Sequence, residues 1–350
     1  MKRVTCLGIL LAVALLAPFS AAAQQVTPAE LEALARFSQT LQQYYQAGTA
    51  ISLEMDAAEE AIDRYANGEL AEAGMRREVE AIRGAARVAI DDYERGVTDL
   101  GTRPKLPDRG REQGMQAFED MVRGLAGHLE AQWALLERLM TAALSGDETA
   151  YNRVSADSLA LAGDMIDSEN VALEAAMLGA GPQHPQTGLY EAVIGSNLAM
   201  QAALIVTEDT LRGREPRVGV ARDAIERGLS RATAGIEAGR RNAVALWQGV
   251  HGKPAVTEAD RISMRFLREL SDAYGAGFDV EAGVVASMRR FVDALVGVLE
   301  NPGGDDAALL ATAETFQTDM MRLADERMNE QSRRLRMVQE FSAALAAAQQ

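Results

Sequence analysis

Small and apolar residues recur at steps of three and four over long stretches of this sequence. Leu34, Leu41, Met55 and Ile62 mark the first such stretch, which extends from residue 28 to residue 66. A sustained heptad pattern predicts long helices that bury one side against neighbouring helices. Aromatic residues make up only 5% of the chain and there are 9 prolines, which favours helices over sheets.

Turn and capping signals divide the pattern into eight helical segments. The first begins at the capping sequence Thr27-Pro28-Ala29-Glu30 and ends at Asn67-Gly68. The others are expected at about 69–100, 110–145, 148–178, 189–212, 215–250, 257–300 and from 305 onward. Because short connectors place successive helices antiparallel, the sequence predicts an all-α fold, an elongated antiparallel helical bundle of about eight long helices in two four-helix halves.

The longest break in the pattern runs from Gly179 to Gly188. We interpret it as the boundary between a first helical-bundle half, 24–180, and a second, 181–350. The apolar seams of the two halves align in part, which is explained equally well by a duplication and by two coincident heptad patterns.

One stripe of very small residues lies on the predicted sixth helix, at Gly228, Ala232, Gly235 and Gly239. In lipid such a stripe indicates helices that dimerise. Because this helix is highly charged, we expect a close helix crossing inside the fold instead, and a homodimer is retained as an alternative.

The first residues have the order of a secretory signal. Lys2 and Arg3 precede an uncharged apolar run at 7–17, and Ala21-Ala22-Ala23 follows a helix break. We expect cleavage after Ala23 and a periplasmic or secreted protein. Cleavage would remove Cys6, the one cysteine of the chain, which would exclude thiol catalysis and thiolate metal sites. The later segment that comes nearest to a transmembrane helix, 193–206, has the length of a buried core helix, so no integral membrane segment is predicted.

The chain is acidic, with 51 Asp and Glu against 35 Lys and Arg, a net charge of −16. Removal of Lys2 and Arg3 with the signal would make it −18. This balance excludes a nucleic-acid-binding surface, which would be basic. Acids cluster at 54–63 and 157–169 and could bind a hard cation or serve as acid and base. On so acidic a chain we interpret them as solvated helix faces.

No motif for a metal, cofactor or nucleophile is present in the sequence. The three histidines, His128, His184 and His251, lack metal-binding spacing, so neither a metal nor a cofactor is predicted. In length, export and paired four-helix bundles the chain resembles the imelysin-like periplasmic proteins. Their Gly-x-His-x-x-Glu marker is not matched, since Gly127-His128-Leu129-Glu130 has a different spacing. The resemblance therefore implies an architecture and no site.

Four residues form the predicted ligand-binding set. Asn197 and Gln201 share one face of the most apolar helix, where their amides need either a ligand in a pocket or partners on a neighbouring helix. Trp133 and Trp247 lie on inner seams, where they either line the same pocket or fill the core.

These observations favour an exported binding or interaction protein of the bacterial envelope, without catalysis, that senses a small ligand or acts as an adaptor for an envelope protein. In architecture it resembles the ligand-binding helical bundles of bacterial sensors. One alternative is a periplasmic chaperone or scaffold, because the segment 326–336 is polar on most sides and would protrude. The other is an enzyme with a carboxylate-based site.

Overall fold

The structure, a computed structural model, describes residues 28–249, 251–300 and 306–348, and within them it contains helices and no strands. The predicted all-α fold is therefore confirmed. The helices are α1 (Pro28–Ala66), α2 (Glu72–Thr98), α3 (Arg109–Ser145), α4 (Glu148–Ala180), α5 (Pro185–Leu211), α6 (Val218–Gln248), α7 (Glu258–Glu300) and α8 (Asp306–Ala348).

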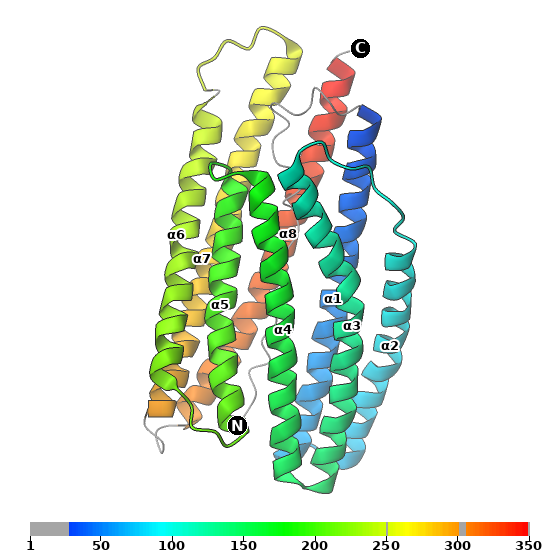
Figure 1. The fold of residues 1–350 in the computed structure, drawn as a ribbon, viewed down its shortest axis with the longest axis vertical. Helices are drawn as coiled ribbons and strands as arrows, with labels where there is room; N and C mark the ends of the chain where they lie inside the picture. The colour runs from blue at the N-terminus through cyan, green and yellow to red at the C-terminus, as the bar shows by residue number, and fades with distance from the viewer. Residues whose placement is uncertain (1–27, 250, 301–305, 349–350) are drawn as a thin grey trace.

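The eight helices of the described residues run side by side along the long axis of the molecule, with α1–α3 towards one edge and α6 and α7 towards the other (Figure 1). Each helix packs on the next one in sequence, and in addition α1 packs on α3 and α5 on α7. One apolar core joins side chains of α1–α5 and α8, and a second joins α4–α8. Both cores cross the boundary expected at residue 180, and the division into two four-helix halves stays a prediction.

The helix ends follow the capping chemistry of the sequence. Gly146 ends α3 in the left-handed region, at φ 66°, and the side chain of Asp147 accepts a hydrogen bond from the nitrogen of Ala150 to begin α4. At the start of α7 the Asp260 nitrogen donates to the Thr257 hydroxyl at 3.0 Å, while the Thr257 nitrogen donates to the Asp260 carboxylate at 2.8 Å. The predicted junction between α3 and α4 and the predicted start of α7 are therefore confirmed.

The fifth helix begins one turn earlier than expected, at Pro185 instead of residue 189. His184 is its N-cap, because the imidazole Nδ1 accepts a hydrogen bond from the Gln186 nitrogen at 3.2 Å. Proline fits the first helical position, where a backbone N–H would have no partner. A histidine cap before a proline is an unusual start, and the sequence pattern did not reveal it.

The small-residue stripe of α6 packs against α5. A Cβ at Gly195 of α5 would collide with the backbone of Ala232, and one at Gly228 would lie 2.6 Å from the carbonyl oxygen of Gly195. The two backbones therefore touch, and the expected close helix crossing is confirmed.

Within the described residues one helix, α5, is long and apolar enough to cross a membrane, and 72% of its most apolar window is buried inside the fold. Its buried side chains reach both apolar cores, as Val193 and Ala203 illustrate.

Candidate functional site

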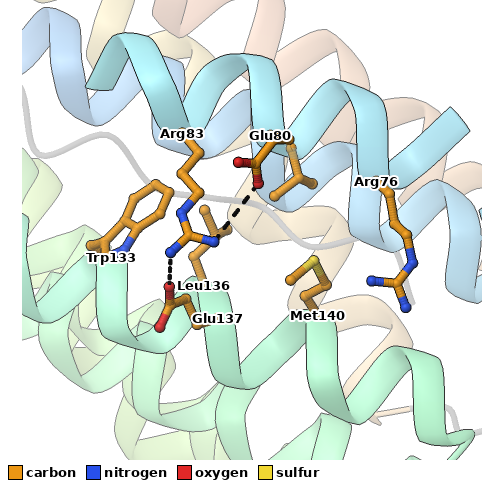
Figure 2. Close-up of a pocket in the computed structure, with 8 residues that line it drawn as sticks. Arg76, Glu80, Arg83, Trp133, Leu136, Glu137 and Met140 are labelled. Carbon is orange, nitrogen blue, oxygen red and sulfur yellow. Dashed lines mark hydrogen bonds and ion pairs between the residues drawn. The ribbon is translucent and has the colours of Figure 1, made fainter. Parts of the chain in front are cut away.

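A depression between α2 and α3 is the first candidate site, and it contains the predicted residue Trp133 (Figure 2). Its volume is about 160 Å³. Its lining residues are Arg76, Val79, Glu80, Arg83, Trp133, Leu136, Glu137 and Met140. The heptad seams of the two helices place the apolar members at the bottom and leave the charged members at the rim, since Val79 and Leu136 are buried while Glu80 and Glu137 are exposed.

The guanidinium of Arg83 lies beside Trp133 and points toward the carboxylates of Glu80 and Glu137 (Figure 2). One of its nitrogens lies 2.9 Å from the Glu137 carboxylate, another lies 3.7 Å from Glu80, and its Cζ lies 5.5 Å from the centre of the Trp133 ring. Arg76 is turned away and pairs at 2.8 Å with a glutamate one turn earlier on α2. A positive group therefore already sits between an indole face and two carboxylates, the surroundings that recognise organic cations in general.

The polar pair of α5 has its partners on α4. The Asn197 amide donates to Glu169 and to the side chain of Asn170, both at 3.0 Å, and the Gln201 amide donates to Asp167 at 2.7 Å. Of the two explanations for these amides, partners on a neighbouring helix and a ligand pocket, the first is confirmed.

Trp247 lies near the C-terminal end of α6, far from Trp133 on α3, because α3 and α6 are towards opposite edges of the molecule (Figure 1). Its ring contacts His251 at 5.1 Å between centroids, and Arg268 of α7 lies 5.8 Å from its centre. The structure does not bring the two tryptophans and the two amides together into one site. A ligand-binding role for each of the four stays a prediction.

A second polar cluster lies in the interior, where α1, α4, α5, α7 and α8 meet; we call it the buried polar network. Glu169 accepts hydrogen bonds from the Tyr45 hydroxyl at 3.3 Å and from Asn197 at 3.0 Å. Arg327 of α8 binds Glu281 of α7 through two nitrogens, one of them at 2.6 Å, and both residues are buried. These two acids and Arg327 lie close enough for their charges to interact.

Burial dominates the electrostatics of the network. Burial away from water raises the pKa of Glu169 to about 7. The hydrogen bonds from Asn197 and Tyr45 and the charge of Arg327 act in the opposite direction but are weaker. On α1, burial and the neighbouring Glu59 raise the pKa of Asp56 well above its usual range. The interpretation of these acid clusters as solvated faces is wrong for Glu59 and Glu169, which are buried.

The signal for the network was present in the sequence. Glu169 lies midway between the apolar seam residues Ile166 and Leu173, and Arg327 follows Leu323 by one turn. A charged residue at a seam position points inward, since seam positions face the neighbouring helices. The polar segment 326–336 likewise does not protrude as expected, because Arg327, Gln331 and Arg334 are buried.

In the described parts of the chain, no three histidine, cysteine or acidic side chains come together in a group that could hold a metal ion. Comparisons of the chain with models of known protein families, with curated proteins and with solved structures find no match.

Proposed function

We propose that this chain is an exported, non-catalytic binding protein of the bacterial envelope, and that its small ligand presents a positively charged group to the Trp133 pocket. The observation that supports the proposal is the position of Arg83, whose guanidinium is held between the indole of Trp133 and the carboxylates of Glu80 and Glu137. The cation in these surroundings is the protein's own Arg83 side chain, and a ligand cation would take its place.

A ligand can replace that internal cation at small cost. The Arg83 side chain is 44% exposed and its partners Glu80 and Glu137 are 73% and 48% exposed, so these ion pairs are solvated. Solvated ion pairs contribute only about 0–1 kcal/mol each. The net charge of −16 also favours the approach of cations from solution.

The size of the pocket limits the ligand group. A volume of about 160 Å³ is below the range of about 300–1,000 Å³ that drug-sized ligands occupy. It suits a single ammonium, trimethylammonium or guanidinium group, with the rest of the ligand lying along the groove between α2 and α3. The thioether of Met140 and the side chain of Leu136 would contact the carbon atoms of that group.

The two tryptophans allow a direct test by fluorescence. Titration with tetramethylammonium and with methylguanidinium should change the emission of the wild type and of Trp247→Phe in a saturable way. The emission of Trp133→Phe should not respond. Sodium at the same concentration is the control for ionic strength. A response that is linear, or that persists in Trp133→Phe, would contradict the proposal.

Removal of the internal competitor sharpens the test. Arg83→Ala should bind the same cations several-fold more tightly, because the ligand no longer displaces the guanidinium. Arg87→Ala is the matched control, since Arg87 lies one turn further along α2, pairs with Asp91 and Glu130, and does not line the pocket. Weaker binding by Arg83→Ala would indicate that Arg83 itself contacts the ligand.

Less supports the two alternative functions. The chaperone alternative depended on a protruding polar helix, but Arg327, Gln331 and Arg334 of α8 are buried in the interior. Glu169 and Glu281 converge inside the fold as an enzyme with a carboxylate-based site would require, but Glu281 is bound by Arg327, and neither acid lines the pocket.

A further inference from the structure

Arg334 of α8 is a buried cation without an ion-pair partner. Its exposed fraction is 5%, and no carboxylate of the described residues lies within ion-pair distance of its guanidinium. One nitrogen makes a long hydrogen bond of 3.5 Å to the carbonyl oxygen of Ala273, and Nε has no hydrogen-bond partner in the described chain. A buried guanidinium with so few partners is costly, so its surroundings point to a missing anion.

Other buried polar atoms near Arg334 have few partners. The hydroxyl of Tyr190 and the amide oxygen of Gln186, both on α5, make no hydrogen bond to a third residue of the described chain, and the two side chains interact with each other. Tyr190 and Tyr274 interact with the charge of Arg334, and the ring of Tyr274 has its centre 5.5 Å from Cζ. We call Arg334, Tyr190, Gln186 and Tyr274 the Arg334 niche.

The backbone around the niche makes room for the guanidinium. A Cβ at Gly277 of α7 would lie 2.7 Å from Nη1 of Arg334. Gln186 lies in the first turn of α5, so the niche is near the positive end of that 27-residue helix. His184, the cap of α5, packs against Tyr274 at 5.8 Å between ring centroids, and burial lowers its pKa to about 4, which leaves it uncharged at neutral pH.

The nearest acids already have other cations. Glu281 is bound by Arg327, and Glu330 lies 3.4 Å from Arg333 on the same helix. The charges of both carboxylates influence Arg334, but neither carboxylate lies within ion-pair distance of its guanidinium. The positive charge of the niche is therefore incompletely balanced by the protein.

We infer that the Arg334 niche binds the carboxylate group of a small organic acid. The planar guanidinium presents donors in the geometry that a carboxylate accepts, and the hydroxyl of Tyr190 supplies one more donor. Because all four residues of the niche are buried, we expect the ligand to be a small acid of one or a few carbon atoms. This site is separate from the Trp133 pocket and does not depend on the function proposed for it.

The test is the thermal stability of the protein in sodium formate, acetate and propionate, against sodium chloride at equal ionic strength and pH 7. The midpoint of thermal unfolding should rise with carboxylate concentration and level off, as expected for a ligand that binds the native state. In Arg334→Gln the rise should disappear. In Arg336→Gln, which removes an exposed arginine from the same helix, it should remain.

Tyr190→Phe guards against a folding defect, because it removes only a hydroxyl whose one neighbouring polar side chain on α5 is Gln186. It should keep the native circular dichroism spectrum and bind formate at least several-fold more weakly by calorimetric titration. Trp133→Phe should bind formate like the wild type. Equal unfolding midpoints in carboxylate and chloride would overturn the inference, and would mean that a halide or water completes the niche.

Discussion

Replacement of Glu169 by glutamine should remove the effect of pH on stability that the buried carboxyl produces. Glutamine has the shape of the protonated acid, and its one oxygen can accept from Tyr45 or from Asn197, which donate to different oxygens of Glu169. In the folded protein the pKa of Glu169 is about 7, and its ordinary value is 4.5. A raised pKa means that the folded state holds the proton more tightly, so the contribution of Glu169 is most favourable below pH 4.5 and is lost as the pH rises to about 7.

The size of the effect follows from these two values. Between pH 5 and pH 8 the wild type should lose about 2.5 kcal/mol of unfolding free energy through Glu169, and the loss should end above pH 8. Glu169→Gln should not lose it, so the variant should gain about 2.5 kcal/mol on the wild type over this interval. The quantity to measure is the difference in unfolding free energy between the two proteins. The lowered pKa of His184 stabilises the folded state as the pH rises over part of the same range, and this partly cancels the loss that Glu169 causes in the wild type.

Urea unfolding followed by circular dichroism at pH 5, 6, 7 and 8 would measure both free energies. Glu174→Gln is the matched control, because it removes an exposed acid from the same helix, and its difference from the wild type should not change with pH. If the difference between Glu169→Gln and the wild type is constant from pH 5 to pH 8, the carboxyl does not titrate there and the argument from burial is wrong.

Three further predictions concern the fold and the start of the mature chain. Gly195→Ala should destabilise the protein by about 2 kcal/mol or more in urea unfolding, because a Cβ would collide with α6, whereas Gly163→Ala, at an open helical position, should stabilise it by about 0.5–1 kcal/mol. Tyr93→Phe should cost about 1 kcal/mol in the same assay, since it removes the buried hydrogen bond of 2.6 Å to the carbonyl of Val122; no loss would show that the carbonyl is satisfied otherwise. Mass spectrometry of the exported protein should find Gln24 at its N-terminus, and a chain that still begins at residue 1 would refute the predicted cleavage.

The helices could be predicted because their determinants are local. A heptad seam such as Leu34, Leu41 and Met55 specifies a helix and its buried side, and Gly146 with Asp147 specifies a junction through dihedral angle and capping alone. The start of α5 was missed because His184 caps it with an imidazole, which sequence rules for N-caps do not include.

The sites were less predictable because they depend on which helices meet. Trp133 lines the pocket between α2 and α3, but nothing on α3 alone shows that Arg83 of α2 covers its ring. Asn197 was identified as a buried amide, and its partner Glu169 was assigned to the solvent. Charge density along one helix does not distinguish an inward acid from an outward one until the seam is traced through it.

The position of α8 bears on the order in which the chain folds. The side chain of Gln339 donates to that of Gln39 at 2.9 Å across 300 residues of sequence, so α8 reaches back to α1. Contacts of such sequence separation form late and slowly, because a large loop must close before they stabilise anything. Until α8 docks, Glu281 lacks its partner Arg327, and the face of α7 that packs on α8 remains open to water. Among the described helices, α8 is therefore the one whose docking closes the charged interior around Glu281.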